Sequence, residues 1–345
     1  MRCPTLKELP SPPQGKTGWP WTEESPQLHN TMPDGSPWPK ISIVTPSFNQ
    51  GQFIEETIRS VLLQGYSDLE YIIIDGGSKD DSIELIRKYE KWLTYWISEP
   101  DHGQSHAINK GFRKASGEIV AWLNSDDYYE KAILDRIVGY FLNETDIDFI
   151  YGNMRQVDFN SVTSGIYVSK DFNLVSLLYY NFIPQQSCFW RTSIFSEMGY
   201  LSEHYVYLMD REFWLRCGIQ KKFLYVPILL AASRRHSEAK SVVNPLGFYK
   251  EGLSVAENFF LTLPRSLFHL KQHRNEILRH LNERIARAFF DIGRIKEARG
   301  YFKRAILADP LRLQTITLFA YIIDTYIGSN IQSRVQSIGR ALKIL

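Results

Sequence analysis

Cysteine is scarce in this sequence. Only Cys3, Cys188 and Cys217 occur among 345 residues, and no C-x-x-C pair is present. The spacing therefore predicts neither a disulfide framework nor a structural zinc site. Such sparse cysteine usage is typical of a reducing compartment. We expect a cytoplasmic protein, and peripheral contact with the inner face of the membrane is left open.

Long hydrophobic runs are also missing. The first residues, MRCPTLKELPSPP, lack the apolar core of a secretory signal. The longest uncharged stretch near the C-terminus, Leu313 to Ile323, has 11 residues, whereas a membrane-spanning helix needs about 20. No spanning helix is therefore expected.

An excess of one charge is absent as well. The chain has 40 Lys and Arg against 38 Asp and Glu, a formal net charge of +2. This balance does not predict a nucleic-acid partner. Hydrophobic residues make up 44% of the sequence, enough for a large core, and the length suits one large domain with additions or two domains.

Three regions differ in texture. Residues 1–39 contain nine prolines and three tryptophans; because prolines at this density exclude regular helix, we expect an extended arm that packs on the domain. Residues 40–244 alternate between strand-like and helix-like segments, and residues 245–345 read as a helical extension. Within the extension, residues 285–310 resemble one tetratricopeptide-type helix pair, and an ordinary helical hairpin explains them equally well.

The strand-like runs of the middle region end in polar residues. Runs at 41–45, 71–75, 95–98 and 118–123 are followed or closed by PSFN, DGGS, SEPD and NSDD. Alternation of strands and helices predicts an α/β domain with a mostly parallel central sheet. Because such sheets bind ligands at the carboxyl ends of their strands, we expect the site at that edge.

The stretch WLNSDD, residues 122–127, ends the fourth run with two adjacent acids, Asp126 and Asp127. Magnesium and manganese prefer oxygen ligands and are often shared between carboxylates and substrate phosphates. The pair therefore indicates a cation that holds a diphosphate. A simple polar turn explains the same residues, so both interpretations stay open.

The other strand ends offer groups that suit a nucleotide. Asp75 can accept the imide N–H of uracil or thymine, and Gly76 permits a close approach. Gly103 precedes a predicted helix whose N-terminus suits an anion. Turn and helix-cap roles are the alternatives. After the first run, backbone and amide groups for a base come from Pro46, Ser47 and Asn49.

Four segments in order, IVTPSFNQ, IIIDGGSKDDS, HAINKGF and GEIVAWLNSDD, together resemble family 2 glycosyltransferases with the GT-A fold over roughly residues 40–240. The resemblance implies an inverting transfer of a hexose or amino-hexose from a UDP- or dTDP-type donor. The acceptor would be a hydroxyl of a glycan or lipid-linked molecule, with Mn²⁺ or Mg²⁺ as cofactor. Surface polysaccharide synthesis is the implied setting.

The resemblance also assigns roles to residues of the α/β region. It places Pro46, Ser47 and Asp75 in the nucleoside pocket and Asn109 and Lys110 beside the donor sugar and diphosphate. The family's acidic metal motif falls on Asn124, Ser125 and Asp126, with Asp127 following. Asn124 departs from the family pattern, which has a carboxylate at this position. Whether the amide weakens metal dependence is left open.

Further downstream, Asp210 matches the family's catalytic base, with Glu212 as the fallback. His236 matches a histidine that can complete the metal shell, and Arg234 or Arg235 can meet the diphosphate. We expect His102 and His106 on a helix surface, Gln185 and Gln186 beside the acceptor or sugar, and Trp190 either on a sugar face or in the core.

Two other functions stay open at this stage. One is a sugar-1-phosphate nucleotidyltransferase, although PSFN lacks the glycine-rich basic loop expected after its first strand. The other is a non-catalytic scaffold in which Asn124 marks a vestigial site. In either case the C-terminal helices could bind a membrane surface or a protein partner.

Overall fold

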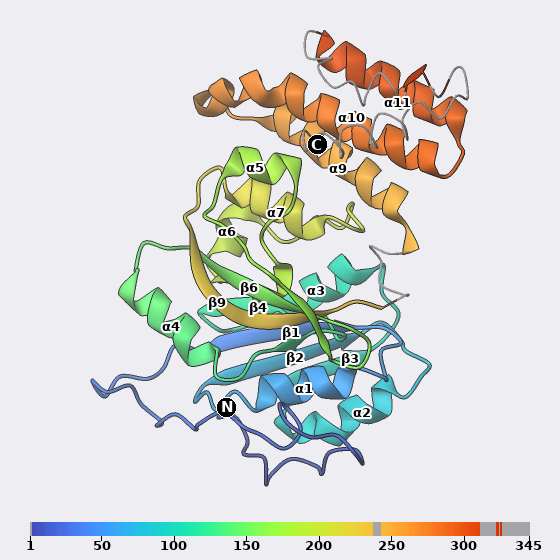
Figure 1. Cartoon of the computed structure of the whole chain (residues 1–345). Helices are drawn as coiled ribbons and strands as arrows, with labels where there is room; N and C mark the ends of the chain where they lie inside the picture. Colours follow the sequence, from blue (N-terminus) through green and yellow to red (C-terminus); the bar gives the residue numbers. More distant parts are fainter. Residues whose placement is uncertain (1, 237–242, 311–321, 324, 326–345) are drawn as a thin grey trace, which may run out of the picture. The chain divides into compact units, whose positions relative to one another are not determined.

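The computed structural model describes residues 2–236, 243–310, 322, 323 and 325. They fall into two compact units: unit 1 takes the described residues of 1–173 and 181–236, and unit 2 those of 174–180 and 237–345 (Figure 1). Residues 313–321 of the uncharged C-terminal stretch lie outside the described part. Within the described ranges, no helix is both long and apolar enough to cross a bilayer.

Unit 1 is built on one sheet with the order β3-β2-β1-β4-β8-β6-β9-β5, and β7 pairs with β6 (Figure 1). The predicted parallel arrangement holds for β3, β2, β1 and β4. Beyond β4 the sheet is mixed, because the short strand β8 runs antiparallel to both β4 and β6. The strands are β1 (Ile41–Ser47), β2 (Leu69–Asp75), β3 (Tyr95–Ser98), β4 (Ile119–Trp122), β5 (Tyr128–Tyr129), β6 (Phe149–Val157), β7 (Thr163–Tyr167), β8 (Cys188–Arg191) and β9 (Phe223–Arg234).

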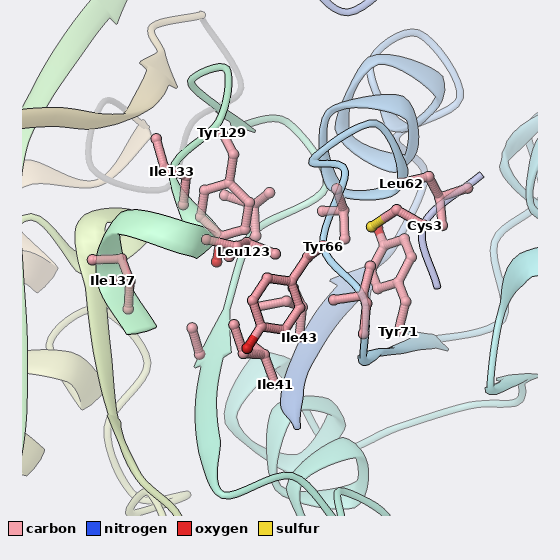
Figure 2. Packing of buried hydrophobic residues seen from close by; sticks show 14 of the residues in the cluster. Cys3, Ile41, Ile43, Leu62, Tyr66, Tyr71, Leu123, Tyr129, Ile133 and Ile137 are labelled. Carbon is pink, nitrogen blue, oxygen red and sulfur yellow. The ribbon is translucent and has the colours of Figure 1, made fainter. Parts of the chain in front are cut away.

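Helices cover both faces of this sheet. On one face, alternate residues of the strands, such as Ile41 and Ile43, pack against the first, second and fourth helices in a core that also holds Tyr66 and Tyr71 (Figure 2). The α/β class predicted from the sequence is therefore confirmed. The helices of unit 1 are α1 (Ile54–Leu62), α2 (Ser82–Tyr89), α3 (Gln104–Phe112), α4 (Leu134–Asn143), α6 (Ile194–Met198) and α7 (Met209–Cys217), with short 3-10 turns η1 (Glu90–Trp92) and η2 (Gln185–Ser187).

The opposite face is packed with aromatic rings from α3, α6 and α7. Trp122 of β4 stacks on Trp214 of α7, with ring centroids 5.9 Å apart, and meets Trp190 of β8 edge-on at 5.7 Å. Trp190 has no exposed surface. Of its two expected roles, the structure therefore gives Trp190 the one in the core, away from any sugar.

The N-terminal arm forms part of unit 1. The side chains of Cys3 and Trp21 are buried. Arg59 of α1 is fully buried and donates hydrogen bonds to three arm carbonyls, those of Pro10, Pro20 and Trp21. Because hydrogen bonds from a charged group are each worth about 1.5–3 kcal/mol, this one side chain fixes the arm on α1.

Unit 2 is helical in its described part. Its elements are α5 (Leu174–Tyr179), α9 (Pro245–Thr262), the 3-10 segment η3 (Arg265–His273), α10 (Arg274–Asp291) and α11 (Ile295–Ala308). Helices α10 and α11 form a hairpin that turns at Gly293, and Phe289 and Phe302 are buried. The predicted helix pair is present, while its identity as a true repeat stays a prediction.

Candidate active site

The carboxyl ends of the parallel strands meet at one edge of the sheet. Ser47, the last residue of β1, pairs with Asp75 of β2, and Asp75 pairs with Ser98 of β3. On the other side of β1, Val44 pairs with Trp122. The turn Asn124–Asp127, called the acid turn below, therefore lies level with Ser47 and Asp75.

Two further strands bring residues to the same edge. β6 pairs antiparallel with β8, β8 pairs antiparallel with β4, and β9 pairs parallel with β6. β6 and β9 thus run in the direction of β1. The turn 158–161 after β6 and residue His236 after β9 consequently arrive beside the acid turn.

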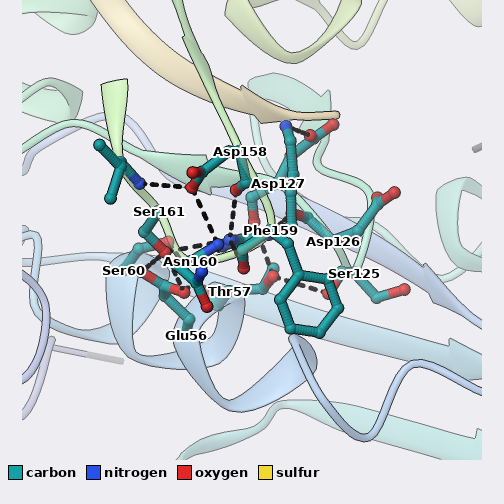
Figure 3. Close-up of polar contacts among 12 residues, drawn as sticks. Glu56, Thr57, Ser60, Ser125, Asp126, Asp127, Asp158, Phe159, Asn160 and Ser161 are labelled. Atoms are coloured by element: carbon teal, nitrogen blue, oxygen red, sulfur yellow. Dashed lines mark hydrogen bonds and ion pairs between the residues drawn. The ribbon is translucent and has the colours of Figure 1, made fainter. Parts of the chain in front are cut away.

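Asp126 is the acid of the turn that reaches solvent, with 23% of its side chain exposed. His236 Nε2 lies 3.0 Å from Asp126 Oδ2, and the imidazole packs on the ring of Phe53 at 5.2 Å. Thr57 of α1 supports the turn from below, because its hydroxyl donates to the carbonyls of Ser125 and Asp127. Ser125 itself is buried and offers its backbone to this support (Figure 3).

Asp127 faces the interior. Its Oδ1 accepts the backbone N–H of Arg234 at 3.0 Å, and its Oδ2 accepts from Gln186 Nε2 at 3.1 Å. Burial and the neighbouring Asp126 raise the pKa of Asp127 to about 8. The predicted metal role of Asp127 gains no support from these contacts, since both carboxylate oxygens are bound to protein donors.

Asn124 is the centre of a chain of amides. Gln104 Nε2 donates to Asn124 Oδ1 at 2.8 Å. Asn124 Nδ2 then donates to Asp127 Oδ2 and to Gln185 Oε1, both at 3.2 Å. A carboxylate at position 124 would turn an oxygen toward both acceptors. The amide is thus the group that fits here, and it links α3 to η2 across the acid turn.

Arg234 is buried beneath the acid turn. Its guanidinium forms an ion pair with Glu56 at 2.8 Å and donates to the carbonyls of Asp126 and Asp158 and to the hydroxyl of Ser161. Figure 3 shows Glu56, Asp158 and Ser161 surrounding this position. The contacts give Arg234 a structural task, and no support for the predicted diphosphate contact. The exposed neighbour Arg235 is free to take that contact.

Asp75 is completely buried at the end of β2. Its Oδ2 accepts hydrogen bonds from Gly77 N, Ser78 N and the hydroxyl of Ser98, whereas Oδ1 accepts only from the hydroxyl of Ser78. Oδ1 retains capacity for one more donor. The predicted base contact therefore depends on that single oxygen.

The loop after β1 contains one buried hydroxyl and one exposed ring. Ser47 Oγ is buried, and no protein group of the described residues forms a hydrogen bond with it. Phe48, which follows it, is 59% exposed. No role was predicted for Phe48 from the sequence, although an aromatic residue directly after a strand end can offer a stacking surface.

Two other predicted residues of this loop region have local roles. Asn49 accepts from Lys79 N at 2.9 Å and so joins the loops after β1 and β2. Pro46 is buried within β1. The space above Gly76 is taken by the carboxylate of Asp101, 2.6 Å from where a Cβ would lie. The close approach expected at Gly76 is therefore made by the protein itself.

Helix α3 begins at the same edge. Gly103, before its first turn, has φ of +116°, which favours glycine, and open space lies above it. Lys110 pairs with Glu99. Asn109 is buried and binds Leu201 and Glu203, which leaves its predicted donor contact without support. The rings of His102 and His106 lie 4.9 Å apart at the start of α3.

Asp210 lies in the first turn of α7 and is partly buried. Asn181 Nδ2 donates to its Oδ2 and Arg211 N to its Oδ1, both at 2.7 Å. Burial raises the pKa of Asp210 to about 6, close to neutral as a general base requires. Glu212, the fallback base, instead forms an ion pair with Arg216 at 2.7 Å.

Comparison with known proteins identifies the family of the chain. A model of the family "Glycosyl transferase family 2" matches residues 42–199. An uncharacterized glycosyltransferase of Mycobacterium tuberculosis H37Rv is 30% identical over 185 residues, which span 52% of this chain and 70% of that protein. An uncharacterized glycosyltransferase of Nostoc sp. PCC 7120 is 34% identical over 147 residues, 40% of this chain and 45% of that protein. The match thus spans less than half of the Nostoc protein.

Solved structures share the fold. S. aureus TarS 1-349 in complex with UDP-GlcNAc aligns with a TM-score of 0.61 at 16% identity over 86% of this chain and 92% of that chain. The mannosyltransferase PcManGT from Pyrobaculum calidifontis, in complex with GDP-Man and Mn²⁺, aligns with a TM-score of 0.54 at 16% identity over 90% and 89%. These neighbours have the GT-A fold. The M. tuberculosis relative is matched over more than two thirds of its length, and the chain therefore belongs to glycosyl transferase family 2.

Proposed function

We propose that the chain transfers a sugar from a nucleotide-diphosphate donor, of UDP or dTDP type, to a hydroxyl of a glycan or lipid-linked acceptor with inversion at the anomeric carbon. The observation that supports this most is the strand register, which sets Ser47, Asp75 and the acid turn on one edge. A role in surface polysaccharide synthesis fits this chemistry.

The residues at the turn fit a divalent cation with a diphosphate. Asp126 and His236 supply one carboxylate and one imidazole within 3.0 Å of each other. Among the described residues no group of three or more metal-ligating side chains exists. Two protein ligands suffice where phosphates and water complete the shell. The imidazole favours Mn²⁺ over Mg²⁺, because nitrogen ligands suit transition metals.

Asp210 acts as the base in this proposal. It removes the proton of the acceptor hydroxyl while that oxygen attacks the anomeric carbon. The bond from the anomeric carbon to the diphosphate breaks, and its electron pair leaves with the phosphate oxygen. The cation, when bound, neutralises the charge that develops on that diphosphate. Asn181 and the backbone of Arg211 keep the carboxylate oriented.

The nucleoside occupies the pocket at the ends of β1 and β2. The orphan hydroxyl of Ser47 and the remaining site on Asp75 Oδ1 are its polar contacts. The exposed ring of Phe48 offers a face on which a base can stack. Arg235 lies next to His236 and meets the diphosphate from the other side of the pocket.

Release of UDP from a panel of UDP-sugars with Mn²⁺ tests the proposal. The unmodified protein should release UDP and bind it in calorimetry, and Asp126→Asn should weaken Mn²⁺-dependent UDP binding at least tenfold. Asp146→Asn is the matched control, because Asp146 is an exposed acid at the start of β6, on the opposite edge of the sheet.

The outcomes separate the alternatives. UDP binding without turnover on any sugar or acceptor would favour the scaffold. No binding of UDP or dTDP at all would remove the donor pocket proposed here. Formation of a nucleotide sugar from a sugar 1-phosphate and a nucleoside triphosphate would assign the chain to the nucleotidyltransferase alternative.

A further inference from the structure

The net charge of the chain is small, but basic and acidic residues are unevenly distributed along the sequence. Residues 245–345 carry 16 Lys and Arg against 8 Asp and Glu, whereas residues 1–244 carry 24 against 30. The helical extension is therefore basic and the remainder acidic. Such asymmetry between parts of a chain indicates interaction with an anionic surface or polymer.

One part of the extension has basic residues and no acidic residues. Residues 258–275, which run from the end of α9 through η3 into α10, contain no Asp or Glu. We call them the acid-free segment. Arg265, Lys271 and Arg274 in this segment are all exposed. On α11, by contrast, Arg294 is paired with Glu297.

Two large apolar side chains protrude from the same segment. Leu261 is 78% exposed and Phe268 is 44% exposed. The ammonium of Lys271 lies 3.6 Å from the centroid of the Phe268 ring. Leu263 and Leu270, by contrast, are buried, and η3 packs against α10. The segment therefore presents aromatic, aliphatic and cationic groups on a supported backbone.

We propose that the acid-free segment docks unit 2 on an anionic lipid surface. In this pose Leu261 and Phe268 enter the boundary between headgroups and acyl chains, and the three cations bind lipid phosphates. Juxtaposed basic and apolar groups are typical of interfacial segments, and each cation near an anionic surface contributes roughly a fivefold gain in partitioning. This inference does not depend on the proposed donor or acceptor.

Lipid fits these groups better than the other anionic partners. A nucleic acid offers no apolar phase for a leucine that is 78% exposed. Large contiguous apolar patches mark many protein interfaces, whereas in this segment a cation, Lys271, lies against the exposed ring of Phe268. Both alternatives remain measurable outcomes of the test.

The test is co-sedimentation of the full chain with vesicles of phosphatidylcholine, with and without phosphatidylglycerol. The unmodified protein should bind the anionic vesicles and not the neutral ones, and added salt should weaken binding. The triple variant R265Q/K271Q/R274Q should lose about 100-fold in partitioning. The matched control K296Q/K303Q/R304Q removes the same charge from exposed residues of α11 and should lose far less.

A second pair of variants tests insertion of apolar groups. Leu261→Ser should reduce binding at high salt, where charge is screened, and Leu307→Ser on α11 should not, although Leu307 is 69% exposed. Far-UV circular dichroism verifies that every variant is folded. Equal binding to neutral vesicles, equal loss in both triple variants, or binding to single-stranded nucleic acid but not to vesicles would each overturn the proposal.

Discussion

The residues beneath the acid turn and the residues at its rim are equally polar but differ in what they bind. Beneath the turn, Glu56, Asp127 and Arg234 are buried, and protein partners occupy their polar atoms. Asp126 at the rim, and Asp210 in α7, keep access to solvent. We call these groups the supporting layer and the rim. The contrast teaches that adjacent residues of one motif can have different surroundings, one bound by protein groups and the other open to solvent.

Removing the proposed base, Asp210, should have the largest effect. Asp210→Asn should lower kcat by about 10²- to 10⁴-fold, because an amide cannot take up the proton of the acceptor hydroxyl, and should leave UDP binding unchanged. Glu212→Gln is the control, since Glu212 is occupied by Arg216, and should retain turnover. The reverse pattern in steady-state kinetics would transfer the role to Glu212.

The supporting layer should respond in stability instead. Arg234→Met leaves Glu56 buried without its partner and frees the carbonyls of residues 158 and 159. We expect a loss of about 3–5 kcal/mol in the free energy of unfolding, measured by urea denaturation. Arg235→Met, one exposed residue further along, should change it by less than about 0.5 kcal/mol. Equal values for both variants would contradict the comparison.

Asn124 belongs to the acid turn, and its substitution tests whether it supports the turn or binds metal. Asn124→Asp places a carboxylate oxygen against Asp127 Oδ2 and Gln185 Oε1, both 3.2 Å from the present amide nitrogen. The expected loss of unfolding free energy is about 1–3 kcal/mol, with Asn143→Asp, at the exposed end of α4, as control. Unchanged stability with tighter Mn²⁺ binding would make Asn124 a weakened metal ligand at the rim.

The pH dependence of turnover should show the smallest effect. The pKa of Asp210 is raised to about 6, so this carboxyl takes up its proton at higher pH than an ordinary aspartate. As the pH falls below 6, the proposed base Asp210 becomes protonated and can no longer accept a proton. The kcat at pH 5 should therefore be about tenfold below its plateau.

The hydrogen-bond donor to Asp210 provides a check on that assignment. Asn181 lowers the pKa of Asp210 by donating to the charged form. Asn181→Ala should therefore raise the pKa of Asp210 and shift the acidic limb of the pH profile to higher pH. The positive charge of Arg211, which also lowers this pKa, remains in the variant. If the acidic limb of the pH profile does not move in this variant, a group other than Asp210 limits the rate.

The sequence contained enough to predict the edge at which the site lies. The strand β3 has the predicted bounds, and the polar ends of four parallel strands converge as expected. Short elements such as β5 and α6 were missed, because two to five residues show no period.

The division between the two layers could not be predicted. Asp126 and Asp127 are neighbours in the chain, yet successive side chains in extended or turning backbone point in different directions. Which one is enclosed depends on donors that come from distant positions, Gln186 and Arg234, 59 and 107 residues further along. Arg234 was placed at the right edge, but nothing in its local sequence shows that its guanidinium is already saturated.

The contacts of Arg59 bear on where the catalytic body of this family member starts. A fragment limited to the matched region, residues 42–199, would lack the carbonyls of Pro10, Pro20 and Trp21. The buried guanidinium of Arg59 would then lose these three hydrogen-bond acceptors. The indole of Trp19, which bonds to the carbonyl of Tyr129 two residues past the acid turn, would go with them. The proline-rich arm is thus packed on α1 as part of unit 1 and is no detachable tail.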